Sequence, residues 1–405
     1  MRLASITSRP VRARHLLLQL AAAALLLAGC GGGGSSGPSS GGTGAGPTSF
    51  AAGHISGFGS VIVNGVRFDD SAALVLDDDG NRSSRDALKL GMGVEIHGGS
   101  IGDDGKGPRA AATEIRHGAE LLGPVSAVDA VAKTLVVLGQ TVRVLDTTVF
   151  DERLVGGFAG IVVGAAVEVH GTFDAATGAY TATRVSPSMA AEGFRIRGIV
   201  SNLDVVAKTF TMGPALISYA TVMPVPANLV DGALIRVRLQ TVQVGGAWVA
   251  DRIDGLGQRH DDANEVELKG TITAFTSQAS FSVNGIPVDA SGAVFGDGAA
   301  SLALGAQVEV KGSSANGVVI ATRVSVEDEE EHRAEGFELH GAITAIDTVA
   351  KTFVLREVKV SYAAAGIEYR KGTEAQLAVG VQLEVKGKLS ADGTMLLAER
   401  ISFGD

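Results

Sequence analysis

One pattern of residues occurs five times along this chain of 405 residues, at intervals of about 70. Each copy begins with a glycine, which an aliphatic residue follows two positions later and an apolar residue five positions later. A second glycine precedes a short alternating segment, and the copy closes with an alanine and an aliphatic residue three positions apart. The first glycines are Gly53, Gly123, Gly198, Gly270 and Gly341, and the second are Gly91, Gly164, Gly232, Gly305 and Gly380. Regular self-similarity predicts a tandem array of small modules.

This period divides the chain into segments. We expect a signal peptide over residues 1–29 and a Gly/Ser-rich flexible tether over 30–50, followed by the copies. The expected copies are 51–118, 119–190, 191–258, 264–328 and 333–405. The third is the most divergent, because it lacks an Asn-Gly turn and three prolines interrupt it. The polar joints at 258–264 and 327–333 read as solvated linkers.

The fourth copy shows the expected order of elements most clearly. Residues 268–275 predict a strand, and Asn284-Gly285 predicts a type I′ hairpin turn because both of its central residues need positive φ. A loose connector over 289–303 leads to strands at 308–312 and 318–326. The fold class is therefore all-β, with five tandem, five-stranded, barrel-like repeats that resemble the OB-fold. An SH3-like barrel or an open meander fits the same strand count.

Two features of the pattern predict local geometry. The glycine that ends each connector indicates a backbone position with positive φ, after one short helical turn. The alanine and aliphatic residue of segments such as Ala321 to Val324 would face opposite sides of a regular strand. Either a β-bulge or burial of both faces is needed there.

The N-terminus predicts a lipid anchor. Arg2, Arg9, Arg12 and Arg14 precede an apolar stretch at 16–29, which is too short to span a bilayer comfortably. Leu27-Ala28-Gly29-Cys30 resembles the bacterial lipobox, which implies lipid attachment at Cys30. An ordinary signal peptide is the alternative, although Cys30 is the only cysteine. Gly31 is not aspartate, so we expect anchoring in the bacterial cell envelope at the outer membrane, with the periplasmic or surface side left open.

The chain also resembles tandem bacterial envelope lipoproteins built from the domain of unknown function numbered 5666. The lipobox, the stretches at 131–135, 206–210 and 349–353, and the strand at 304–312 carry this resemblance. It covers residues 51–405. The resemblance implies the architecture and the location, and it implies no activity.

Charge excludes one class of partner. The whole chain has a net charge of −10, and the part after residue 29 has 30 basic and 44 acidic side chains, a net charge of −14. Because such a body repels phosphate backbones, we expect no nucleic-acid partner. The expected partners are the membrane, through the lipid, and an envelope protein or polysaccharide.

Acidic and basic residues recur at fixed positions of the copies. Glu168, Glu309 and Glu384 share one position, and Arg184, Arg323 and Arg400 share another. If the last two strands of a copy form a hairpin, these residues should face each other as surface ion pairs. Copies one and three break this pattern, with Glu95 and Glu114 in the first and Arg236 and Arg252 in the third.

Metal motifs are weak. Residues 77–81 (DDDGN) suggest a calcium loop, but an EF-hand loop starting at Asp77 would need glycine at 82 and glutamate at 88. His97 and His170 share a slot that holds Arg or Lys in other copies, which indicates a solvated surface position. We therefore expect no metal site and no cofactor site.

Catalytic and ligand motifs are weak as well. G-x-S-x-G occurs around Ser35, in the tether, and around Ser100, between two expected strands rather than before a helix. The aromatic residues Phe58, Phe210, Phe275 and Phe353 share core positions, whereas Trp248 and Tyr180 are candidates for partial exposure.

The residues thus favour a non-enzymatic envelope lipoprotein with a structural or binding role, and no catalytic residue is assigned. One alternative is a ligand-binding module for a sugar or a divalent ion. Another is an enzyme with its site in the third repeat or at a joint between repeats, which polar residues converging in one pocket would favour.

Overall fold

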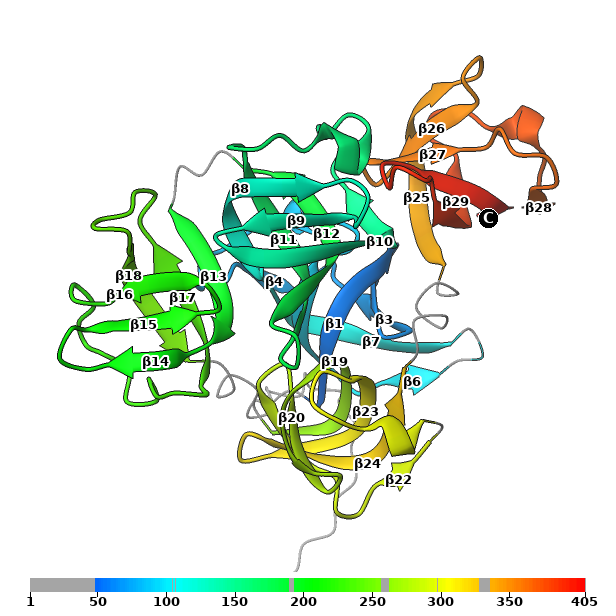
Figure 1. Ribbon diagram of the computed structural model, residues 1–405. Coiled ribbons are helices and arrows are strands. Elements are labelled where there is room, and N and C mark those ends of the chain that lie inside the picture. The colour runs from blue at the N-terminus through cyan, green and yellow to red at the C-terminus, as the bar shows by residue number, and fades with distance from the viewer. Residues whose placement is uncertain are drawn as a thin grey trace, which may run out of the picture. The chain divides into compact units, whose positions relative to one another are not determined.

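The structure is a computed structural model that describes residues 48–103, 105, 107–188, 193–255, 262–296, 298–327 and 336–404 (Figure 1). Cys30, Ser35, the expected signal peptide and nearly all of the expected tether lie outside these residues. Within them the elements are strands and four short 3-10 helices. None of these helices is long and apolar enough to cross a membrane.

The elements fall into successive groups, which we call barrels 1 to 5. Barrel 1 holds β1 (Ser49–Phe58), β2 (Val61–Val63), β3 (Val66–Asp69), β4 (Leu74–Leu76), η1 (Arg85–Ala87), β5 (Gly93–Gly98), β6 (Gly102–Asp103) and β7 (Pro108–His117). Barrel 2 holds β8 (Leu121–Asp129), β9 (Thr134–Val137), β10 (Gln140–Phe150), η2 (Gly157–Gly160), β11 (Ala166–Asp174) and β12 (Ala179–Pro187). Barrel 3 holds β13 (Phe194–Ile199), β14 (Ser201–Asp204), β15 (Thr209–Met212), β16 (Ala215–Ser218), β17 (Leu234–Leu239) and β18 (Trp248–Gly255).

Barrel 4 holds β19 (Ala263–Ser277), β20 (Ser280–Val283), β21 (Ile286–Asp289), β22 (Val294–Phe295), η3 (Ala299–Ser301), β23 (Gln307–Ala315) and β24 (Val318–Val326). Barrel 5 holds β25 (Phe337–Asp347), β26 (Thr352–Leu355), β27 (Val358–Ser361), β28 (Glu368–Arg370), η4 (Glu374–Gln376), β29 (Gln382–Leu389) and β30 (Leu396–Phe403).

One cycle of strand pairing closes barrels 1, 2, 4 and 5, whereas in barrel 3 the pairing runs from β13 through β17, β18, β16 and β15 to β14, which follows β13 directly in the chain. In barrel 2, β8 pairs with β9, β9 with β10, β10 in parallel with β12, β12 with β11, and β11 returns to β8. The corresponding strands of barrel 5 form the same cycle. A closed cycle excludes the open meander. The expected fold class, all-β with small five-stranded barrel-like units that repeat, is confirmed.

The first glycine of a copy leaves room for the hairpin turn that folds over it. A Cβ at Gly53 would lie 2.2 Å from Asn64 Oδ1, and a Cβ at Gly270 would lie 2.1 Å from Asn284 Nδ2. Both asparagines occupy the first position of a turn, where φ is 52° for Asn64 and 49° for Asn284. The following glycines also have positive φ, so the expected type I′ turns are confirmed.

The glycine that ends each connector has the expected left-handed backbone, with φ between 78° and 91° at all five positions. A 3-10 turn precedes it in barrels 1, 2, 4 and 5, and the described connector of barrel 3 has none. Because a Cβ is strained at such φ values, this turn explains why glycine recurs there.

A β-bulge in the middle of the last strand explains the spacing of the alanine and the aliphatic residue. The register of β11 and β12 shifts between His170 and Gly171, so that Thr183 has no direct partner. Ala182 and Val185 on either side are both buried. A Cβ at Gly171 would lie 2.1 Å from the carbonyl oxygen of Thr181, which explains the glycine that ends the alternating segment.

The valine-alanine-lysine stretches form polar turns. In three barrels an aspartate accepts hydrogen bonds of 2.8–2.9 Å from the backbone N–H groups two and three residues later. These aspartates are Asp129, Asp204 and Asp347. The lysine of each turn has positive φ, at Lys133, Lys208 and Lys351. The stretch that carried the family resemblance is therefore a turn motif.

The barrels share strands and cores. β1 pairs in parallel with β19 over Ser49–Ala52 and with β25 at Gly57 and Phe58, while β8 pairs with β13. One hydrophobic cluster draws on barrels 1 and 5, and another on barrels 2 and 3. Burial between barrels adds stability that a single small barrel lacks.

Most core predictions are confirmed at the level of single residues. Phe58, Phe210 and Phe353 are buried as expected, but Phe275 is 36% exposed. Tyr180, a candidate for exposure, is buried, whereas Trp248 is partly buried and contacts Phe194 edge-on at 5.6 Å. The prediction for Tyr180 was wrong because the neighbouring barrel 3 covers it, as the bond from its hydroxyl to Arg197 shows.

Candidate functional site

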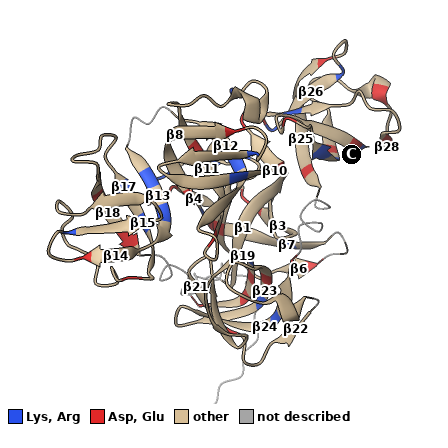
Figure 2. Cartoon of the chain, viewed as in Figure 1, with Lys and Arg blue, Asp and Glu red and all other residues tan. Residues whose placement is uncertain are grey.

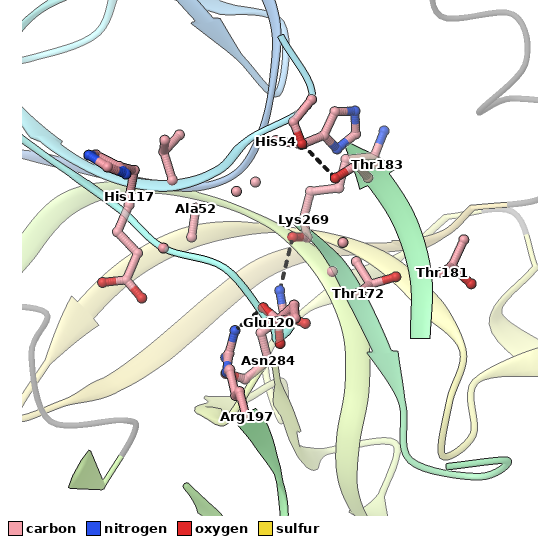
Figure 3. Close-up of a pocket in the computed structure, with 18 of the residues that line it drawn as sticks. Ala52, His54, His117, Glu120, Thr172, Thr181, Thr183, Arg197, Lys269 and Asn284 are labelled. Atoms are coloured by element: carbon pink, nitrogen blue, oxygen red, sulfur yellow. Dashed lines mark hydrogen bonds and ion pairs between the residues drawn. The ribbon is translucent and has the colours of Figure 1, made fainter. Parts of the chain in front are cut away.

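A cavity of about 150 Å³ lies where the barrels meet (Figure 3). Its walls come from β1 and β5 of barrel 1, β11 and β12 of barrel 2, and β19 of barrel 4, with single residues from the other two barrels. A second hollow of about 210 Å³ shares His54, Ser56 and Lys269 with it. The site therefore exists only in the joined barrels.

Hydroxyl groups of barrel 2 form one wall of the cavity. Thr172 on β11 and Thr181 on β12 lie directly opposite each other in the ladder, and Thr183 lies at the bulge. Thr183 Oγ1 donates a hydrogen bond of 2.6 Å to the carbonyl of Gly91 in barrel 1. A Cβ at Gly91 would lie 2.4 Å from the carbonyl oxygen of Thr183, so this contact also requires glycine.

The acidic loop at residues 77–81 lies against the arginines of barrel 3. Asp77 accepts backbone hydrogen bonds from Asp79 and Asn81, which fixes the loop as a tight turn. Asp78 Oδ1 lies 3.0 Å from Arg236 Nη2, and Asp79 Oδ2 lies 2.9 Å from Arg195 Nη2. The sequence of this loop suggested a calcium site, but in the structure arginine side chains, rather than a metal ion, neutralise its carboxylates.

Two more arginines complete this basic face. Arg238 and Arg252 each lie 3.5 Å from a carboxylate oxygen of Asp79. Figure 2 shows the basic residues of β13 as blue segments. The acidic loop of barrel 1 and the arginines of barrel 3 are therefore complementary, whereas Glu114 pairs at 2.6 Å with Arg116 on its own strand.

Burial dominates the chemistry of Asp78. It raises the pKa of Asp78 to about 6, and the charges of Arg236 and Arg195 offset that effect only in part. A Cβ at Gly118 would lie 1.6 Å from Asp78 Oδ1. The glycine at the end of β7 is thus what allows this carboxyl to enter the joint.

A second ion pair crosses the barrels beside the cavity. Arg197 Nη1 lies 2.6 Å from Glu120 Oε1, and Arg197 Nη2 donates a bond of 2.7 Å to the carbonyl of Asn284 (Figure 3). Burial lowers the pKa of Arg197, but the charges of Glu120 and Glu95 outweigh it, so the net shift is upward. Arg197, which lies on β13 of barrel 3, therefore stays charged and contacts barrels 2 and 4 at once.

Histidines lie in the same joint. His170 is fully buried, and its Nδ1 lies 2.9 Å from the carbonyl oxygen of Gly118, so this nitrogen carries a proton. Its Nε2 lies 3.1 Å from Glu168 Oε1. Burial raises the pKa of Glu168, but His170 and His117 outweigh it and lower the value to about 2. Burial, followed by the charge of His170, lowers the pKa of His117.

The histidine prediction needs correction. His97 and His170 were expected in a solvated slot, yet they are 7% and 0% exposed. Arg and Lys keep this position at the surface of barrels 3, 4 and 5, whereas neighbouring elements cover it in barrels 1 and 2. The residue type at a repeat position therefore did not predict whether that position is buried.

The expected cross-strand ion pairs were also wrong in register. Arg184 lies opposite His170, Arg323 opposite Lys311, and Arg400 opposite Lys386. Each arginine lies opposite the residue two positions after the expected glutamate, and the one-residue bulge accounts for only one position of this difference. The glutamates instead contact the basic residue two positions along their own strand, as Glu309 does with Lys311 at 3.0 Å. Arg184 pairs with Asp151 at 2.8 Å.

One cluster in barrel 5 resembles a metal site. Ligand atoms of Glu338, His340 and Glu384 lie within 4.8 Å of one another. Arg67 lies 2.6 Å and Lys386 2.9 Å from Glu338 oxygens. Burial raises the pKa of Glu338, but His340, Lys386 and Arg67 outweigh it and lower the value to about 2. Two cations already neutralise the carboxylates, which disfavours a divalent ion there.

Ser100 does not form a nucleophile elbow. It lies between β5 and β6, without a following helix, and its Oγ contacts Thr48 Oγ1 at 3.5 Å. The second G-x-S-x-G serine, Ser35, and Cys30, the residue where lipid attachment is expected, lie outside the described residues.

The sequence contained a signal for the joint that was not used. Arg236 and Arg252 stood out because they broke the acidic–basic pattern of their own copy, and residues 77–81 stood out as an acidic run in copy one. Comparing these two features between copies predicts that the acidic loop contacts the basic copy.

Comparison with known families agrees with the repeated architecture. Residues 123–186, 269–325 and 340–402 match the family model described as Domain of unknown function (DUF5666). Three successive segments of the chain therefore match this domain in tandem. The matched segments begin at or next to the first glycines of barrels 2, 4 and 5, so the family pattern and the barrels coincide. No curated protein matches the chain.

Proposed function

We propose that this protein is a non-enzymatic lipoprotein of the bacterial cell envelope. In this proposal, a lipid on Cys30 anchors the chain in the outer membrane, and the tether at 30–50 displays the joined barrels. Its role is structural or binding, with an envelope protein or polysaccharide as the partner and no nucleic acid. The arrangement Leu27-Ala28-Gly29-Cys30 after an apolar stretch supports the anchor.

The observation that carries the non-enzymatic role is the pairing of the charged residues at the joint. Asp78 pairs with Arg236, Glu120 with Arg197, and Asp79 with Arg195, each between elements of different barrels or copies. Charged groups that neutralise one another hold surfaces together and are poorly placed to transfer protons to a substrate. The enzyme alternative at a repeat joint requires a group there that is free to react.

The cavity supports a second candidate, a ligand-binding module. Its polar walls and its volume are those of a small-molecule site rather than of a tightly packed domain contact. A sugar fits this candidate better than a divalent ion, because the cluster around Glu338 already holds Arg67 and Lys386.

Cell fractionation tests the anchor. Cys30→Ser should move the protein from the membrane fraction to the soluble fraction, because the lipid has no attachment point. Ser36→Ala, in the same tether, is the matched control and should stay with the membranes. Continued membrane association of Cys30→Ser would contradict the proposal. A pull-down of envelope components with the mature chain then tests the binding role.

A further inference from the structure

The charges around the cavity balance. Four acidic residues line it, Asp77, Asp78, Glu95 and Glu120, and four basic residues, Arg116, Arg197, Arg236 and Lys269. Arg197 and Arg236 pair with acids of this wall, and Lys269 Nζ lies 2.8 Å from Glu327. An ionic ligand would leave its own charge uncompensated in a buried place, which costs free energy. The cavity therefore favours a neutral ligand.

Three threonine hydroxyl groups in the lining have no protein partner among the residues that the structure describes. Thr147, Thr172 and Thr181 have no side-chain hydrogen bond within the described chain, and all three line the cavity. Thr172 and Thr181 are direct cross-strand partners, so their side chains lie side by side. A hydroxyl both donates and accepts, which matches the hydroxyl groups of a sugar.

Size and apolar surface point to the same class of ligand. The cavity has room for about ten water-sized positions, by the space that one buried water requires. That space suits a molecule of one or two sugar rings. Phe50 and Phe337 contribute apolar surface to the walls, against which the C–H face of a ring can pack.

We propose that this cavity binds a neutral saccharide of one or two rings, with Thr172 and Thr181 as hydrogen-bonding residues. This inference rests on the binding role proposed above and names its ligand class. Because the walls come from several barrels, the site requires the joined chain and is absent from a single barrel.

The test uses the mature chain carrying Cys30→Ser and a panel of neutral sugars: glucose, N-acetylglucosamine, maltose, cellobiose and chitobiose. Saturation-transfer NMR and calorimetry should detect binding of at least one of them at millimolar concentration. Inorganic phosphate and Ca²⁺ are the ionic probes and should not bind in the cavity. The proposal would be overturned if none of the sugars binds, or if only the ionic probes bind.

Variants locate the site. Thr172→Val with Thr181→Val keeps the branched shape, removes both hydroxyls and should weaken sugar binding tenfold or more. Thr141→Val, on the exposed face of β10, is the matched control and should bind as the parent does. Sugar binding that survives the double substitution unchanged would contradict the assignment.

A second variant fills the cavity from another wall. A Cβ at Gly93 would meet only the carbonyl oxygen of Gly118, at 3.9 Å, so Gly93→Leu adds volume without a backbone clash and should block binding. These experiments distinguish a failure of the sugar proposal from a failure of the proposed membrane location. A chain that fractionates with membranes and binds no sugar refutes only the ligand, and a chain that binds sugar without membrane association refutes only the anchor.

Discussion

The carboxylate of Asp78 and the guanidinium of Arg236 lie 3.0 Å apart, although they belong to barrels 1 and 3. Asp78 is 7% exposed, so this pair is largely withdrawn from water. Removing one partner of a buried pair leaves an uncompensated charge, which is far more destabilising than the loss of a surface pair. The joint between the barrels therefore depends on complementary charges that no single copy contains.

Arg236→Leu should lower the free energy of unfolding by about 3–5 kcal/mol, because it leaves Asp78 buried without its nearest cation. Urea unfolding followed by circular dichroism measures the change. Arg370→Leu is the control: Arg370 pairs with Glu368 at 2.7 Å at the surface, and its loss should cost about 1 kcal/mol or less. Equal effects of the two substitutions would show that the joint is not buried in solution.

Asp78→Asn should change how stability depends on pH. The pKa of Asp78 in the folded chain is about 6, above its ordinary value of 3.8, because burial favours the neutral form. Its contribution to stability is therefore complete below pH 3.8 and is lost as the pH rises through 6. Asparagine stays neutral, so the variant should lack this decline, and the difference in stability between the two proteins should change between pH 4 and pH 7. An equal loss of stability with rising pH in both proteins would contradict the raised pKa of Asp78.

Glu168→Gln should act with the opposite sign. The pKa of Glu168 is lowered to about 2, because the favourable charge of His170 outweighs burial. Its contribution is present above pH 4.5 and is lost as the pH falls through 2. The variant should therefore be less stable than the parent at pH 7, and the difference should shrink in acid. Melting temperatures at matched ionic strength between pH 2 and 7 give this comparison.

Gly171→Ala should be destabilising by about 1–3 kcal/mol, as overpacking in a fixed backbone usually is. Its Cβ would lie 2.1 Å from the carbonyl oxygen of Thr181, on the strand that the bulge holds in place. Gly102→Ala meets no atom within 4 Å and should be neutral or slightly stabilising. Thermal unfolding of both variants separates the close approach from the general effect of replacing glycine.

Glu357→Gly should stabilise barrel 5 by about 1 kcal/mol. Arg356 and Glu357 form the β26–β27 turn with φ values of 51° and 60°, a conformation that non-glycine residues adopt at a cost. Glu357 also pairs with Lys89, an exposed contact of little value. Lys89→Ala removes that pair alone and serves as the control. If Glu357→Gly is more destabilising than Lys89→Ala, the backbone of the β26–β27 turn is not strained at Glu357.

Local geometry was predictable wherever one residue type is required by the backbone. Gly305 predicted a left-handed position and has φ of 83°, and Asn284 with Gly285 predicted a type I′ turn that is present. The spacing of Ala321 and Val324 required a bulge or burial of both faces, and the register of β24 contains a bulge. These features follow from short-range sterics, which act within a few residues.

The register of the last two strands was not predictable to the same degree. Arg184 was expected opposite Glu168 and lies opposite His170, and the one-residue bulge accounts for only one of these two positions. A sequence can show that an extra residue is present without showing where the ladder absorbs it or how the turn sets the register. The expected ion pairs failed because the sequence did not specify this register.

By itself the sequence determined the repeating barrel, its turns and its glycine positions, because each copy repeats the same short-range requirements. Only the tertiary structure decided which copies touch, that His170 is buried, and that the loop at 77–81 meets Arg195 and Arg236. Contacts between copies depend on how whole surfaces complement one another in shape and charge. No period along the chain encodes that match, so the cavity between the barrels became visible only in three dimensions.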